Sequence, residues 1–252
     1  MSTTDVLSEQ AYVSERIDPA AGQQSYLHLS DLRLAMEAYR SDQPLRVLDF
    51  GCGGSPYRPL FPNADYRRAD CAGIADLNYV IGEDGVIDET DNTFDLILST
   101  QVLEHVPDPA AYLAEARRLL KPGGLLLCST HGSFEDHACP DDFWRWTSEG
   151  LRRTLIAADF AVEQMSKLTT GPRAMVFTFE RNHAELWAQM HKHRSSALRL
   201  VLWPFIFMLQ KHRRYLHLAC DRYFPDHRVV LNGLERHIYY VVLMAACRKP
   251  EK

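Results

Sequence analysis

Residues 47–56 read VLDFGCGGSP, an apolar run that ends in three glycines within four positions. A short apolar run bounded by glycine is typical of a buried strand. Glycines directly after a strand let the backbone approach a ligand without a Cβ in the way. In an open parallel sheet, ligands bind beyond the carboxyl ends of the strands. The stretch therefore predicts a ligand-binding loop at the end of the first strand of such a sheet.

The rest of the chain favours the same kind of sheet. Continuously apolar runs alternate with helical patterns, which indicates strands covered by helices on both faces. The expected strands are 45–50, 65–69, 77–81, 94–99, 125–129, 160–168 and 238–247. The expected helices are 25–40, 109–120 and 148–158. The predicted fold class is α/β, with a doubly wound and mostly parallel sheet.

Two features distinguish the ligand of the glycine loop from a dinucleotide. A dinucleotide fingerprint is G-x-G-x-x-G opening a full helix, whereas three prolines between 56 and 62 cut this helix short. Asp49, before the first glycine, would repel a pyrophosphate and suits a cation such as an ammonium or sulfonium. Asp70, at the end of the second expected strand, is placed to accept from two ribose hydroxyls. A surface-loop role for Asp70 remains the alternative.

Four motifs in order carry a resemblance to a known family. They are DFGCGG at 49–54, Asp70, NTFDLILSTQVLEHVPDP at 92–109 and LKPGGLLL at 120–127. The chain resembles a class I S-adenosylmethionine-dependent methyltransferase, and more narrowly the type 11 methyltransferase domain, over residues 45–168 and the last strand. The resemblance implies a Rossmann-like sheet of seven strands. Its last strand, at 239–247, would be antiparallel and inserted between strands five and six.

The resemblance also implies S-adenosyl-L-methionine as the cofactor and a set of residues that bind it. This set is Asp49, Gly51, Cys52, Gly53, Asp70, Cys71, Glu83, Asp84, Val86 and Gln101. Its glycine loop would line the methionine part, and Asp70 would hold the ribose. The acids and the valine at 83–86 would border adenine. Gln101 would lie near the transferred methyl group.

Three histidines are the expected catalytic residues. Methyl transfer is an in-line displacement in which alignment supplies most of the rate, and a hydroxyl or amine acceptor also benefits from a general base. Histidine is the natural base near neutral pH. His105, His131 and His137 all lie near predicted strand ends. For His105 a plain helix-packing role is the favoured alternative.

The segment 131–147, HGSFEDHACPDDFWRWT, follows the fifth expected strand and resembles a stretch found in many type 11 members. We expect it to cover the acceptor pocket, with Phe143, Trp144 and Arg145 contacting the acceptor. Arg145 could equally pair with an acid, and the aromatics could be core residues. No metal is expected, because the histidines and aspartates of the segment fit no compact ligand spacing.

A basic segment separates the expected core from its last strand. Residues 172–236 carry eleven Lys/Arg against five Asp/Glu, a net charge of +6 within a chain of −5. We therefore expect four parts. They are an N-terminal helical lid at 1–44, the donor-binding catalytic core at 45–170, a helical insertion at 171–236 and the final strand at 237–252. Within the insertion, residues 198–214 combine an apolar run with basic flanks. Two interpretations remain: a cap on the acceptor pocket, or a helix that lies on an anionic membrane surface.

The predicted function is methyl transfer to an oxygen or nitrogen of a small-molecule, sugar or lipid-linked acceptor. The net charge of −5 gives no reason to expect nucleic-acid binding. The polar N-terminal stretch lacks an apolar signal-peptide core, which favours a cytoplasmic location, with membrane association left open. A nucleotide-dependent oxidoreductase and a non-catalytic S-adenosylmethionine-binding scaffold are the alternatives.

Overall fold

The computed structural model describes residues 13–137, 139, 141–192, 196–225, 228–230 and 238–251. A single sheet of eight strands forms the centre of this part of the chain, in the order β3-β2-β1-β4-β5-β8-β6-β7. The strands are β1 (Arg46–Phe50), β2 (Asp65–Asp70), β3 (Tyr79–Val80), β4 (Phe94–Thr100), β5 (Leu120–His131), β6 (Ala161–Thr170), β7 (Arg228–Val230) and β8 (Tyr240–Arg248).

The strand directions follow the expected pattern. Neighbouring strands from β3 to β5 are parallel, whereas β8 is antiparallel to both β5 and β6. The last strand is thus inserted between β5 and β6. The α/β class, the mostly parallel sheet and the Rossmann-like topology are confirmed.

The sheet has one strand more than the seven expected. The additional strand, β7, comes from the basic insertion and pairs antiparallel with the edge of β6. The opposite edge strand, β3, is shorter than the expected 77–81 and has only two residues. Val80 in β3 is 57% exposed, so this edge buries little apolar surface and leaves a weak pattern in the sequence.

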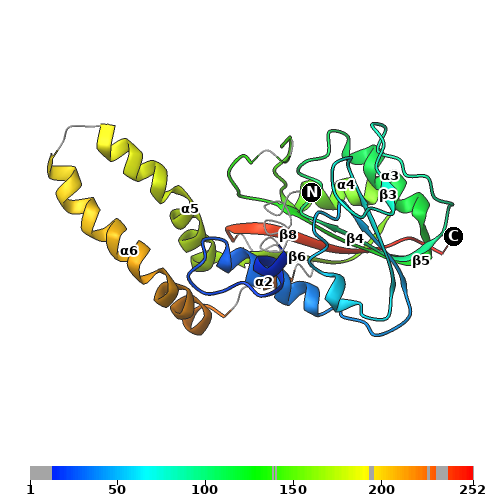
Figure 1. The fold of residues 1–252 in the computed structure, drawn as a ribbon, viewed down its shortest axis with the longest axis horizontal. Coiled ribbons are helices and arrows are strands. Elements are labelled where there is room, and N and C mark those ends of the chain that lie inside the picture. The colour runs from blue at the N-terminus through cyan, green and yellow to red at the C-terminus, as the bar shows by residue number, and fades with distance from the viewer. Residues whose placement is uncertain are drawn as a thin grey trace.

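Helices cover both faces of the sheet (Figure 1). They are α2 (Tyr26–Glu37), α3 (Pro109–Leu119), α4 (Ser148–Ala157), α5 (Gly171–Lys192) and α6 (Ser196–Tyr223), together with the 3₁₀ turn η1 (Arg58–Leu60). On one face α3 and α4 contribute Leu113 and Leu151 to the core. On the other face α2 and α5 contribute Leu32 and Phe177. Burial on both faces explains why the central strands read as continuous apolar runs.

The insertion between β6 and β8 is a helical hairpin made by α5 and α6, and Figure 1 shows it extending away from the sheet. Its base is tied to α2 by buried charges. Arg173 of α5, 3% exposed, donates to both oxygens of Asp31 at 2.6 and 3.1 Å and to Asp221 of α6 at 2.8 Å. The boundary expected at 236–237 lies outside the described residues.

Candidate active site

A cavity of about 580 Å³ lies at the carboxyl ends of β1, β2, β4 and β5. The expected site residues that line it are Gly51, Gly53, Asp70, Cys71, Glu83, Asp84, Gln101, His105, His131, His137 and Phe143. The expected residues outside its lining are Asp49, Cys52, Val86, Trp144 and Arg145. The fold thus brings seven of the ten expected donor residues and all three histidines around one space.

The glycine loop is held in a conformation that a side chain would disturb. Gly51 has a φ of +81°, and a Cβ there would lie 2.6 Å from a methyl of Val102. The Gly53 N–H donates to Asp70 at 2.7 Å, and the Gly53 carbonyl accepts from Arg68 at 2.7 Å. The carboxylate of Asp70 and the guanidinium of Arg68 therefore fix the loop from the neighbouring strand β2.

Asp49 requires a correction, because it lies beneath the loop and does not line the methionine part of the cavity. Its side chain is buried and accepts from the Tyr66 hydroxyl at 2.7 Å. Burial raises the pKa of Asp49 to about 7. The carboxyl therefore supports the loop from within the core.

Cys52 and Val86 also lie away from the cavity. The thiol of Cys52 is buried, and this burial raises its pKa to about 12. Val86 is 43% exposed and faces solvent, while its backbone carbonyl accepts from Gly82 at 3.0 Å. The expected adenine contact of Val86 is thus not supported, although Glu83 and Asp84 in the same turn line the cavity.

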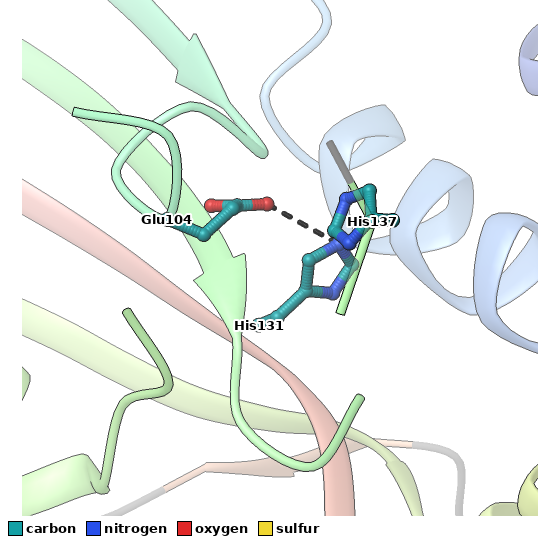
Figure 2. Close-up of side chains that lie close together, drawn as sticks. All are labelled: Glu104, His131 and His137. Carbon is teal, nitrogen blue, oxygen red and sulfur yellow. Dashed lines mark ion pairs between the residues drawn. The ribbon is translucent and has the colours of Figure 1, made fainter. Parts of the chain in front are cut away.

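The three histidines expected to be catalytic line one end of the cavity. Figure 2 shows two of them, His131 and His137, beside Glu104, which was not expected from the sequence. Glu104 follows β4, His131 ends β5 and His137 lies in the loop after β5. Glu104 Oε1 lies 3.2 Å from His131 Nε2. The His105 ring lies 4.8 Å from the His137 ring between centroids, and its Nδ1 lies 2.6 Å from the Asp141 carbonyl.

Burial dominates the electrostatics at this end. It raises the pKa of Glu104 to about 7 and lowers the pKa of His131 well below its usual value. His28 of α2 is also buried nearby, and its pKa falls to about 3 for the same reason. The buried histidines are therefore neutral near pH 7, as a proton acceptor or a metal ligand must be.

In the loop at 141–146 Arg145 takes the alternative of pairing with an acid, and the expected acceptor contact of Trp144 needs correction. Arg145 makes a bidentate pair with Asp142 at 2.5 and 2.7 Å, and this pair holds the pKa of Asp142 well below its usual value. The indole N–H of Trp144 donates to the Val106 carbonyl at 2.8 Å. Both side chains organise the loop, and only Phe143 of the expected acceptor contacts lines the cavity.

Several lining residues were missed by the sequence analysis. They are Arg16, Ser25, His28, Gly85, Thr100, Val102, Tyr112, Phe134 and Arg181, among others. Those from α2 and α5 reach the cavity only through tertiary packing, which no local motif records. Glu104 had a signal, because it stands beside His105 in the LEHV motif.

The cavity fits S-adenosylmethionine on features of its own. Its volume falls within the range of about 300–1,000 Å³ that is usual for ligand sites. Gln101 has a φ of +55° and a buried amide nitrogen without a hydrogen-bond partner, and His28 Nδ1 is likewise buried without one. Buried polar atoms of this kind are normally satisfied. Both residues line the cavity, so a polar ligand would satisfy them.

Residues 21–167 match the model of the family described as the methyltransferase domain. The chain belongs to this family. The match confirms the class I S-adenosylmethionine-dependent methyltransferase that the motifs predicted, with S-adenosylmethionine as its cofactor.

Among curated proteins, the chain is 41% identical over 105 residues to a ubiquinone biosynthesis O-methyltransferase of Cereibacter sphaeroides (strain ATCC 17025), covering 35% of this chain and 42% of that protein. It is 33% identical over 107 residues to the enzyme of the same name from Maricaulis maris, covering 36% of this chain and 42% of that one. The chain thus spans less than half the length of these relatives.

Two solved structures share the fold. The [4+2]-cyclase SpnF superposes with a TM-score of 0.53 at 18% identity, over 98% of this chain and 93% of SpnF. Phosphoethanolamine N-methyltransferase 2 of Haemonchus contortus, solved with phosphomonomethylethanolamine and S-adenosylhomocysteine, gives 0.52 at 14% identity, over 98% of this chain and 58% of that one. At these identities the likeness concerns the fold alone.

Proposed function

We propose that this chain transfers the methyl group of S-adenosylmethionine to a hydroxyl oxygen of a small, partly apolar acceptor. The observation that carries the proposal is one continuous cavity with two chemically different ends. The glycine loop and Asp70 lie at one end, and His105, His131 and His137 lie at the other. The names of the curated relatives, which are O-methyltransferases, support oxygen as the methylated atom.

Each end has a separate task. S-adenosylmethionine supplies the methyl group when bound. Asp70 accepts from the ribose hydroxyls, and the bare backbone at Gly51 and Gly53 admits the methionine part. Phe143 and Phe134 give the acceptor end an apolar wall that excludes water. A histidine at this end takes the proton of the acceptor hydroxyl, so that the oxygen can attack in line.

The test uses isotopically labelled S-adenosylmethionine with matched acceptors, a catechol and the corresponding aromatic amine. We expect label in the catechol product and not in the amine. His137→Ala should lower turnover strongly while it changes S-adenosylhomocysteine affinity little, because His137 lies at the acceptor end. His212→Ala, an exposed histidine of α6, is the matched control. Full turnover in the His137 variant, or label in the amine alone, would contradict the proposal.

The α6 helix favours an acceptor that is drawn from a membrane surface. Its exposed side chains include Trp203, Phe207, Met208, Tyr215 and Leu218, interspersed with Lys211 and Arg214. Trp203 stacks on Phe207, and Lys211 lies over the Phe207 ring. Apolar residues with flanking cations suit the surface of an anionic bilayer. We propose that this helix contacts such a surface and brings the cavity to a lipid-soluble acceptor.

Within 198–214, the side chains at 198–202, 205–206 and 209–210 lie outside the described ones. None of the described helices combines the length and the apolar character that crossing a bilayer requires. The proposed contact is therefore peripheral.

A further inference from the structure

Glu104, His131 and His137 form a cluster whose ligand atoms all lie within 4.8 Å of one another. Figure 2 shows the three side chains pointing toward one another from three different segments of the chain. Glu104 and His131 are almost completely buried, and His137 is partly exposed toward the cavity. Glu104 was not among the metal ligands considered from the sequence. Those came from residues 131–147, which follow β5, whereas Glu104 precedes β5.

The contact between Glu104 and His131 has the spacing of two ligands that share one cation. Glu104 Oε1 and His131 Nε2 are 3.2 Å apart, yet Glu104 Oε1 has no hydrogen-bond partner. Two nitrogen or oxygen ligands at about 2.0–2.2 Å from a tetrahedral cation lie roughly 3.3–3.6 Å apart, slightly more than the separation in this structure. A buried carboxylate oxygen left without a hydrogen bond is costly unless a cation satisfies it.

Neighbouring groups orient two of the three side chains, as they do around bound metals. Glu104 Oε2 accepts from the buried Thr130 hydroxyl at 2.7 Å, which turns Oε1 toward the histidines. His137 Nδ1 lies 3.3 Å from the Glu135 carbonyl and 3.4 Å from Asp142 Oδ2. This arrangement leaves His137 Nε2 free to bind a cation.

We infer that Glu104, His131 and His137 bind one divalent transition-metal cation at the acceptor end of the cavity. Two imidazoles and one carboxylate suit zinc, manganese, iron or cobalt better than magnesium or calcium, which prefer oxygen ligands. Three protein ligands leave coordination positions open toward the cavity, as in catalytic zinc sites.

The cation would bind the acceptor hydroxyl and lower its pKa, so that the bound oxygen gives its proton to His105, which lines the cavity outside the cluster, and becomes the nucleophile. The oxygen then forms a bond to the methyl carbon, and the carbon–sulfur bond breaks with its electron pair remaining on sulfur. One proton is released and no oxidant or reductant is needed. This role in methyl transfer rests on the proposed function, whereas the metal site itself does not.

The experiment titrates the chelator-treated full chain with Zn²⁺ by calorimetry and with Co²⁺ by visible absorption. We expect one cation per chain and a Co²⁺ spectrum of four or five ligands. Zn²⁺ binding should weaken about 10- to 100-fold in Thr130→Val, which removes only the hydroxyl that orients Glu104. The loss should be larger in each of the three ligand variants, Glu104→Gln, His131→Asn and His137→Asn. His105→Asn is the matched control, because His105 shares the cavity but stands outside the cluster.

Three results would overturn the inference: no binding of either cation to the unaltered chain, full affinity in all three ligand variants, or an equal loss in the His105 control. S-adenosylhomocysteine binding to the same samples separates the two proposals. Donor binding without cation binding removes the metal site and leaves the proposed function standing. Cation binding without donor binding removes the proposed function and leaves the metal site standing.

Discussion

At the scale of single residues, Gly51 is a position that tolerates no side chain without strain. Its φ of +81° is a left-handed conformation, and Val102 fills the space that a Cβ would need. The side chain of valine has little torsional freedom to move aside. The loop before the donor site is therefore set by sterics as well as by its contacts to Asp70 and Arg68.

We predict that Gly51→Ala lowers both stability and S-adenosylhomocysteine affinity. The left-handed conformation costs about 1–2 kcal/mol for an L-residue, and overpacking against Val102 adds about 1–3 kcal/mol. Gly73→Ala is the matched control, because Gly73 has a φ of +107° but no atom within 4 Å of the added Cβ. Urea unfolding and calorimetry measure the two effects. Equal losses in both variants would contradict the predicted role of Val102.

Asp49 should make the stability of the fold depend on pH. Its carboxyl has a pKa of about 7 in the folded chain, against 3.8 as the usual value, because burial disfavours the charged form. The folded state therefore holds its proton to higher pH than the unfolded state does, and stability falls as pH rises from about 4 to 7. A difference of about three pKa units corresponds to about 4 kcal/mol.

Asp49→Asn should remove this fall and make the chain more stable than the unaltered protein at pH 8, while the two differ little at pH 4.5. The asparagine oxygen can still accept from Tyr66. Urea unfolding of both proteins from pH 4.5 to 8 checks the prediction. A stability difference that does not change with pH would refute it.

At the scale of elements, the helical hairpin depends on buried charge at its base. Arg173, Asp31 and Asp221 connect α5, α2 and α6, and the Tyr26 hydroxyl donates to Asp221 at 2.6 Å. Removing one member of a buried ion pair leaves the other charge uncompensated. These contacts thus join the hairpin and α2 into one structural unit.

Arg173→Ala should lower the free energy of unfolding by about 3–5 kcal/mol, because the buried Asp31 carboxylate loses its cation. The matched control is Arg153→Ala on α4, whose pair with Glu149 is exposed and is worth about 0.3–0.5 kcal/mol. Urea denaturation of the two variants gives the comparison. A loss at Arg173 as small as at Arg153 would show that the buried pair does not stabilise the fold.

We expect the chain to bind anionic vesicles at low salt through the exposed face of α6. Binding to neutral vesicles should be much weaker, because apolar insertion and charge attraction act together. Replacing Trp203 and Phe207 by serine should reduce the bound fraction in co-sedimentation. Ile156→Ser is the control, since Ile156 is similarly exposed but belongs to α4, outside the helical hairpin. Absence of binding to anionic vesicles would remove the proposed membrane contact.

At the scale of the whole molecule, the sheet was predictable because its central strands are buried on both faces. The start of α3 was also predictable from Asp108 and Pro109. In the structure Asp108 accepts from the N–H groups of Ala110 and Ala111, and Pro109 takes the first helical position. The edge strand β3 was predicted too long, and β7 was not predicted, because strands of two or three residues leave no periodic pattern.

The site divides in the same way. The donor end depends on a contiguous loop and on Asp70, so local sequence patterns predicted its lining at Gly51, Gly53 and Asp70, but not that Asp49 lies beneath the loop. The acceptor end depends on contacts between distant segments, such as Glu104 with His131 and the approach of His28 from α2. For Arg145 the sequence left two roles open, and only the structure shows that Asp142 pairs with its guanidinium.

The most direct test of the account is calorimetry of the full chain with S-adenosylhomocysteine. We predict binding of one molecule per chain, weakened by about 1–3 kcal/mol in Asp70→Ala because two ribose hydroxyls lose their acceptor. Asp42→Ala, at an exposed position, should bind as the unaltered protein does. No binding to the unaltered chain, or an Asp70 variant with full affinity, would contradict the donor site described at the end of β1 and β2.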